Sequence, residues 1–137
     1  MVDMEFKASI DQLHKILEWI AKQLKPMRFD HGMMHHIELA SEEALVNIIH
    51  HAYQGRPEKV EIQVKLLPDR AEIFFEDCGP PFNPLNSLPI DLSQPLETRV
   101  VGGLGIHFMR KCVDDIRYAR HGEKNVLTFV IHSSRKK

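Results

Sequence analysis

Two polar residues in an otherwise apolar segment could act on one ligand. In "SEEALVNIIHH", Glu43 and Asn47 are four residues apart, so on a helix both side chains leave the same face about one turn from each other. Such a pair is most often a solvated helix face, and we expect Asn47 at a surface-facing position. Asn is a poor helix former, however, and here it lies between Val46 and Ile48, where a plain surface position would favour Glu, Lys or Gln. A carboxylate and an amide stacked in this way can serve a single ligand.

A second candidate lies where a strand-like run ends. "AEIFFE" runs into "EDCGPPFNP", residues 76–84, and the two stretches share Glu76. An acidic residue at the end of a strand is commonly just a solvated terminus. Alternatively, the strand holds Asp77 rigid to accept a hydrogen bond from a ligand, and Gly79 lets the backbone approach that ligand without a Cβ in the way.

The third candidate is "GGLG", residues 102–105, which opens a segment of helical spacing. Free backbone N–H groups at the positive end of a helix are the usual physical basis for holding phosphate. The segment is not a dinucleotide fingerprint, because Phe108 stands where a third glycine would fall, and no G-K-[ST] of a P-loop occurs in the chain. A nucleotide would therefore bind by a different plan.

Histidines and cysteines give weaker signals. His31 could share a helix face with His35 or His36, but no H-E-x-x-H or Cys/His framework accompanies the nine histidines, which favours surface roles over a metal site. Cys78 and Cys112 are too few for a disulfide framework or a zinc site, and we interpret both as reduced thiols.

The elements that must position these residues follow from periodicity. Helical spacing predicts one helix over residues 10–24, begun by a Ser9/Gln12 capping box, a second from "HGMMHH" through "NIIHHAY", and a third in "GGLGIHFMRKCVDDI". Alternation predicts strands in "MEFKAS", "VEIQVKLL", "AEIFFED", "IRYAR" and "NVLTFVIH", the last two around the turn "HGEKN". We predict an α+β fold, a two-layer α/β sandwich with a mostly antiparallel mixed sheet and three helices on one face.

Composition narrows the function classes. A chain of 137 residues with 43% hydrophobic residues predicts one domain over residues 1–137, and its net charge of −1 gives no general attraction to nucleic acid. Without an apolar run of about 18 residues or a signal-peptide pattern, we expect a cytoplasmic protein with no membrane partner. Residues 78–101 carry five prolines and no sustained period, so they are either a binding lid or a disordered insertion.

Taken together, "EEALVNIIHHAY", "EDCGPPFNP" and "GGLGIHFMRKCVDDI" resemble the N box and the two glycine boxes of the GHKL superfamily of ATPases and kinases, in the same order. The "PPF" and "GGLGI" stretches most resemble the bacterial anti-sigma factor serine/threonine kinases of partner-switching pathways. The resemblance covers nearly the whole chain. The first glycine box departs from many GHKL members, which place a second glycine where this chain has proline.

The resemblance implies ATP and Mg²⁺ as cofactors and assigns roles to particular residues. Asn47 would hold the magnesium ion and Glu43 would be the general base, while Asp77 would accept the adenine amino group beside Gly79. Gly103, Leu104 and Gly105 would bind the phosphates, and residues 80–101 would form an ATP lid.

The resemblance also implies partners. The protein would be a homodimer that sequesters a sigma factor and phosphorylates a serine of an anti-sigma factor antagonist protein. Two other hypotheses stay open: a non-catalytic nucleotide-sensing binding module of the same fold, and a free-standing ATPase or sensor kinase fragment. Glu43 separates the first of these from the kinase, because a module that only binds has no need of a base.

Overall fold

A five-stranded sheet forms one layer of the molecule. The computed structural model describes residues 1–52, 58–81, 83, 85 and 109–133. The strands are β1 (Val2–Ala8), β2 (Glu58–Leu66), β3 (Arg70–Asp77), β4 (Asp115–His121) and β5 (Lys124–His132). Their order in the sheet is β1-β2-β3-β5-β4, and all four pairings between them are antiparallel. The strands predicted from alternation are therefore confirmed.

Helices form the second layer. They are the 3₁₀ turn η1 (Ile10–Gln12), α1 (Leu13–Leu24), the 3₁₀ turn η2 (Lys25–Met27), α2 (His31–Asn47) and the π-helical turn η3 (Ile48–Ala52), with a further helical turn at residues 109–112. The predicted capping box at Ser9 is wrong: its side chain makes no cap bond, and its carbonyl instead accepts the Gln12 N–H at 3.0 Å in a 3₁₀ turn. Asp30 caps α2, where its Oδ1 accepts the Met33 N–H at 2.7 Å.

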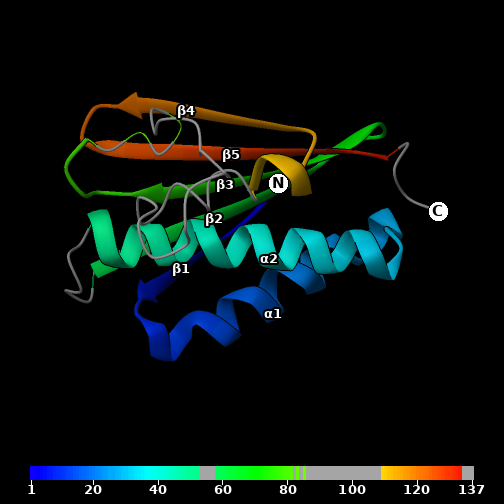
Figure 1. The fold of residues 1–137 in the computed structure, drawn as a ribbon, viewed down its shortest axis with the longest axis horizontal. Coiled ribbons are helices and arrows are strands. Elements are labelled where there is room, and N and C mark those ends of the chain that lie inside the picture. Colours follow the sequence, from blue (N-terminus) through cyan, green and yellow to red (C-terminus); the bar gives the residue numbers. More distant parts are fainter. Residues whose placement is uncertain (53–57, 82, 84, 86–108, 134–137) are drawn as a thin grey trace, which may run out of the picture.

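The core lies between the helices and one face of the sheet (Figure 1). Every second residue of β3 faces it, and Ala71, Ile73 and Phe75 are fully buried. Phe75 meets Phe129 of β5 edge to face, with ring centroids 5.1 Å apart. Met109, in the helical turn at 109–112, belongs to the same core, so this turn packs on the same face of the sheet as α1 and α2. The predicted two-layer α+β sandwich is confirmed.

One end of the molecule collects the polar candidates. In Figure 1 the C-terminal ends of α2, β3 and β4 lie at the same side of the structure as the start of β5. Antiparallel pairing explains this, because Asp77 at the end of β3 lies opposite Asn125 at the start of β5. The phosphate-binding candidates Gly103, Leu104 and Gly105 lie outside the described residues, as do residues 82, 84 and 86–101 of the lid predicted over 80–101.

Within the part of the chain that the structure describes, no helix is long and apolar enough to cross a membrane.

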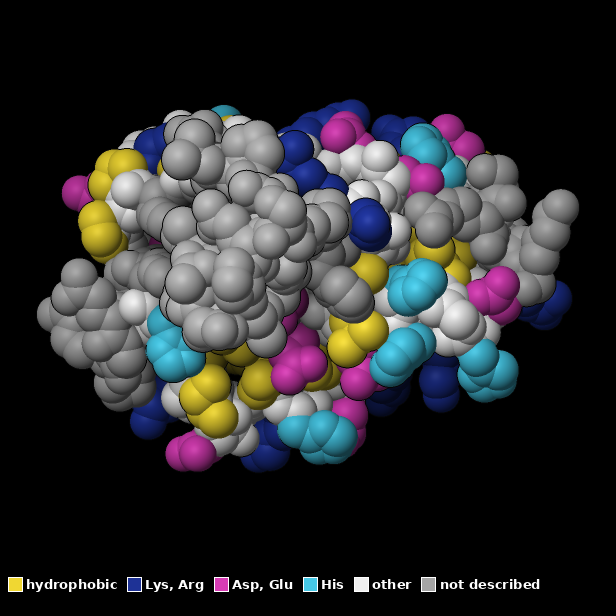
Figure 2. All heavy atoms as spheres, viewed as in Figure 1, with side chains coloured by type: hydrophobic (Ala, Val, Ile, Leu, Met, Phe, Trp, Pro, Cys, Tyr) yellow, Lys and Arg dark blue, Asp and Glu magenta, His cyan; other side chains and the backbone are white. Residues whose placement is uncertain are grey.

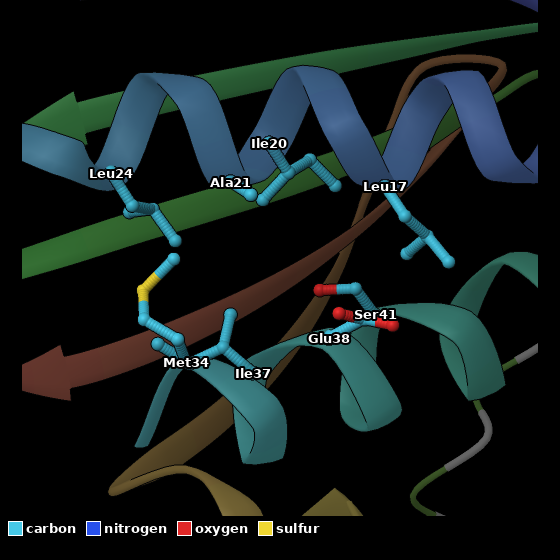
Figure 3. Close-up of a pocket in the computed structure, with 8 residues that line it drawn as sticks. All are labelled: Leu17, Ile20, Ala21, Leu24, Met34, Ile37, Glu38 and Ser41. Carbon is cyan, nitrogen blue, oxygen red and sulfur yellow. The ribbon is translucent and has the colours of Figure 1, made fainter. Parts of the chain in front are cut away.

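A small cavity of about 10 Å³ lies between α1 and α2, with room for about one water molecule (Figure 3). Its walls are apolar except for Glu38 and Ser41, whose side-chain oxygens face α1 in Figure 3. Ser41 is fully buried, and among the described residues its hydroxyl has no hydrogen-bond partner. An unpaired buried hydroxyl costs stability, and Ser is a poorer helix former than Ala.

We therefore expect Ser41→Ala to raise the free energy of unfolding by about 1 kcal/mol. Urea denaturation followed by circular dichroism measures this change. The reverse substitution Ala40→Ser, at the adjacent and equally buried position, should lower the stability. A loss of stability in Ser41→Ala would contradict the prediction and would mean that the hydroxyl binds a water in the cavity.

Candidate functional site

Asp77 is a buried residue whose two carboxylate oxygens differ in their hydrogen bonding. It ends β3 and is only 5% exposed. Its Oδ1 accepts two hydrogen bonds at 2.9 Å, one from the Gly79 backbone N–H and one from the Asn125 side-chain amide. Its Oδ2 accepts no hydrogen bond from any residue that the structure describes. The strand and these two donors thus fix the carboxylate while one oxygen is left for a ligand, which rules out the simple solvated strand end.

The electrostatics of Asp77 are unusual for an Asp with hydrogen-bond donors. Burial raises its pKa above the ordinary value, while the Asn125 amide, the Gly79 N–H and the Arg120 charge act in the opposite direction. Burial is the largest of these effects. Ionisation of this buried carboxyl therefore costs stability, a pattern that is common at functional sites.

Three residues of this site were missed from the sequence: Asn125, Arg120 and Tyr118. Asn125 is 4% exposed and reaches Asp77, and the Tyr118 hydroxyl donates to its Oδ1. Arg120 donates from Nη1 to the Gly79 carbonyl at 2.8 Å. A sequence signal existed for Asn125, since it shares the inward-facing alternation of the core strand "NVLTFVIH", where a polar residue is out of place.

Asn47 lies in the last turn of α2, and its predicted exposure is wrong. Only 9% of the residue is exposed, because Asn47 follows Ala40 and Ala44 at helical spacing and so belongs to the buried stripe of the helix. Its side chain makes no hydrogen bond with any other described residue. Its amide oxygen is therefore available for a cation.

Glu43 lies one turn before Asn47 on α2 and is half-buried. Burial raises the pKa of its carboxyl, and the neighbouring charge of Glu42 raises it further. Among the described residues, Glu43 forms no ion pair that would hold it ionised. A carboxylate whose pKa is moved toward neutrality is a better proton acceptor, which suits a general base.

Of the residues predicted for the site, the structure brings Asp77 and Gly79 into direct contact. It places Glu43 and Asn47 one helical turn apart in α2, the helix that ends on the Asp77 side of the molecule (Figure 1). The arrangement offers a fixed hydrogen-bond acceptor, an amide oxygen and a proton acceptor at one end of the sheet.

The histidines whose side chains the structure describes are exposed. No group of three or more His, Cys, Asp or Glu side chains that could hold a metal ion occurs among the described residues. Figure 2 shows histidines as separate spots on the face in view, in keeping with the surface roles expected for them. Cys78 and Cys112 are reduced thiols, as predicted; the first is exposed and the second is buried.

Comparison with known sequences finds relatives that share one name, serine-protein kinase RsbW. A serine-protein kinase RsbW of Bacillus mycoides (strain KBAB4) is 31% identical over 120 residues, covering 85% of this chain and 75% of that protein. The RsbW of Bacillus cereus (strain Q1) is 31% identical over 121 residues, with the same coverage. These relatives agree with the resemblance drawn from the three sequence motifs.

Solved structures share the fold. The RsbU and RsbW domains of a Mycobacterium tuberculosis protein superpose with a TM-score of 0.65 at 13% identity, covering 96% of this chain and 32% of that one. This chain thus spans about a third of the length of that protein. The histidine kinase AdeS of Acinetobacter baumannii gives a TM-score of 0.55 at 17% identity, over 97% of this chain and 69% of that chain. Since the family model of the histidine kinase-like ATPase domain matches residues 6–131, the chain belongs to the family of histidine kinase-like ATPase domains.

Proposed function

We propose that the protein binds ATP, with Asp77 as the acceptor for the adenine amino group. The observation that carries this proposal is that the two oxygens of the Asp77 carboxylate differ. Oδ1 accepts hydrogen bonds from Gly79 and Asn125, whereas Oδ2 accepts none from the described residues. An ionised carboxylate can only accept, so the open oxygen selects a base with a donor at that point. Gly79 would let the adenine ring approach the backbone, and Gly103, Leu104 and Gly105 would bind the phosphates, with residues 80–101 as the lid.

The reaction we propose is transfer of the γ-phosphoryl group to a serine. Glu43 takes the proton of the serine hydroxyl as the bond from its oxygen to phosphorus forms and the bond from phosphorus to the bridging oxygen of ADP breaks. Asn47 would hold Mg²⁺, which neutralises charge on the phosphates. The side-chain amide of Asn47, which makes no hydrogen bond with another described residue, fits a cation that prefers oxygen ligands.

As partners we propose a sigma factor and an anti-sigma factor antagonist, with the kinase acting as a cytoplasmic homodimer. The names of the relatives as serine-protein kinases support the kinase part of this proposal. The kinase would sequester the sigma factor until the unphosphorylated antagonist displaces it, and phosphorylation would end that displacement. This requires the phosphate to weaken docking of the antagonist, by like-charge repulsion or desolvation.

A non-catalytic nucleotide-binding module is the main alternative. The raised pKa of Glu43 favours the enzyme, because a module that only binds ATP gains nothing from a half-buried carboxylate poised to take a proton. Incubation of the purified protein with radiolabelled ATP and candidate antagonists tests this directly. Label on an antagonist serine supports the kinase, and ATP binding without transfer to any of the antagonists would favour the module.

The magnesium assignment has its own test. Asn47→Ala should weaken ATP binding in the presence of Mg²⁺ by about tenfold or more, since an interaction of a polar group with a charge is worth about 1.5–3 kcal/mol. Asn47→Asp, which keeps an oxygen ligand, is the matched control and should retain magnesium-dependent binding. Calorimetry with Mg²⁺ and with EDTA measures both. Unchanged Mg-ATP affinity in a folded Asn47→Ala protein would contradict the assignment.

A further inference from the structure

The guanidinium of Arg120 joins two backbone segments that are distant in sequence. From β4, the strand at the far edge of the sheet, its Nη1 donates to the Gly79 carbonyl at 2.8 Å. Its Nε donates to the Gly122 carbonyl at 3.1 Å. One side chain therefore ties the step after β3 to the turn of the β4–β5 hairpin.

The hairpin turn is shaped to hold this side chain. Gly122 follows His121, the residue that pairs with Lys124 across the hairpin, and has φ of 60°. This is the left-handed region that the first central residue of a type II′ hairpin turn requires, and only glycine enters it without strain. The Gly122 carbonyl is thus a fixed acceptor for Arg120, two residues earlier.

Asn125 reinforces the same backbone from the neighbouring strand. Its side-chain amide donates to Asp77 Oδ1 at 2.9 Å and to the Pro80 carbonyl at 3.0 Å, with a longer contact of 3.4 Å to the Gly79 carbonyl. The Tyr118 hydroxyl donates to Asn125 Oδ1, which orients the amide. The carbonyls of Gly79 and Pro80 and the carboxylate of Asp77 are therefore held by one connected network.

We propose that Arg120 is a positioning residue for base recognition, which holds the Gly79 peptide in place and thereby fixes the carboxylate of Asp77 toward the adenine amino group. Its contact with Asp77 is indirect: Arg120 binds the Gly79 carbonyl, and the Gly79 N–H binds Asp77 Oδ1. Its positive charge also opposes the effect of burial and favours the ionised carboxylate. This inference rests on the proposed role of Asp77 in ATP binding.

The sharpest test combines a nucleotide that lacks the 6-amino group with substitutions of Arg120. Affinities for ATP and for purine riboside triphosphate, which lacks the 6-amino group, are measured for wild type, Arg120→Gln and Arg120→Lys. Arg117→Gln is the control: it removes the same charge from the same strand, but Arg117 alternates to the other face of the sheet and pairs with Asp115 at 2.8 Å.

Wild type should prefer ATP over the purine analogue. In Arg120→Gln the affinity for ATP should fall about tenfold while the affinity for the analogue changes little, because the lost interaction serves only the amino group. Arg120→Lys keeps the charge but cannot donate to both carbonyls as the guanidinium does. Its preference for ATP over the analogue should therefore lie between those of wild type and Arg120→Gln. Arg117→Gln should match wild type.

Two results would overturn the inference, and they are distinguishable. If wild type prefers ATP but Arg120→Gln and Arg120→Lys lose affinity equally for both nucleotides, Arg120 has only a structural role, and the assignment of Asp77 stands. If wild type binds both nucleotides equally, the assignment of Asp77 itself fails, and that of Arg120 fails with it. Circular dichroism of each variant verifies the fold, and Arg120→Lys carries the test should the Gln variant not fold.

Discussion

Glu43→Gln should bind ATP as wild type does and yet transfer phosphate about 10²–10⁴-fold more slowly, the loss expected when a general base is removed. Gln keeps the size and polarity of the side chain, and the proposed contacts to adenine, metal and phosphates lie elsewhere. Because the pKa of Glu43 is raised by burial and by Glu42, wild-type transfer should increase with pH over a range above the ordinary Glu value. That limb of the pH profile should vanish in the variant.

Glu42→Gln is the matched control for this prediction. It removes one carboxylate from the adjacent position and also removes the Coulombic contribution to the pKa of Glu43, so the limb should persist and shift to lower pH. Phosphotransfer to the antagonist, followed over pH with radiolabelled ATP, compares the three proteins. In a competition pull-down with the proposed sigma factor and antagonist, wild type should recapture sigma factor over time, whereas Glu43→Gln should go on releasing it. Equal recapture by both would exclude Glu43 as the base.

Asp77→Asn should weaken ATP binding roughly 10–100-fold, the value of a lost hydrogen bond to a charged group. The geometry decides which atom of the new amide faces the ligand. The Gly79 N–H and the Asn125 amide both donate to the Oδ1 position, so the amide oxygen must stay there. The new NH₂ group then takes the Oδ2 position and opposes the adenine amino group, donor against donor.

The same change should reduce the preference for ATP over inosine triphosphate, which carries a carbonyl in place of the amino group. Glu76→Gln is the control, since Glu76 is the adjacent residue of β3 and faces the other side of the sheet. Calorimetric titration with both nucleotides measures the two preferences. Unaltered discrimination in Asp77→Asn would remove Asp77 from base recognition.

The stability of Asp77→Asn should move in the opposite direction to its affinity. Because the folded protein binds the Asp77 proton more tightly than the unfolded chain, wild type loses stability as the pH rises through the raised pKa. A neutral Asn that keeps both hydrogen bonds avoids that loss, so the variant should melt at or above the wild-type temperature at neutral pH. A stabilised protein that no longer recognises its base would mark Asp77 as a residue retained for function.

Much of the fold was predictable because its signals are local. The strand "AEIFFED" alternates strictly and appears as β3, and the helix predicted over residues 10–24 corresponds to η1 and α1 together. The strand order was not predictable in the same way. Placing β5 between β3 and β4 depends on contacts such as Phe75 with Phe129, which no local pattern encodes.

The candidate site shows the same difference between local signals and long-range contacts. Asp77 and Gly79 could be found because a carboxylate and a glycine at the end of a strand are locally unusual. Asn125 and Arg120 could not be connected to them, because they lie 48 and 41 residues from the groups they hold. The exposure of Asn47 was predicted wrongly because propensity describes what a residue prefers, whereas its position after Ala44 on the buried stripe decides where it lies.

The strand order also has a consequence for biosynthesis. A ribosome releases β3 well before β5, so until the last hairpin emerges β3 has an unpaired edge and Asp77 lacks both Asn125 and Arg120. Such an edge is open to pairing with other chains. A nascent chain therefore cannot form the proposed adenine acceptor until β4 and β5 have been translated, and nucleotide bound at that moment would favour the docked hairpin by mass action.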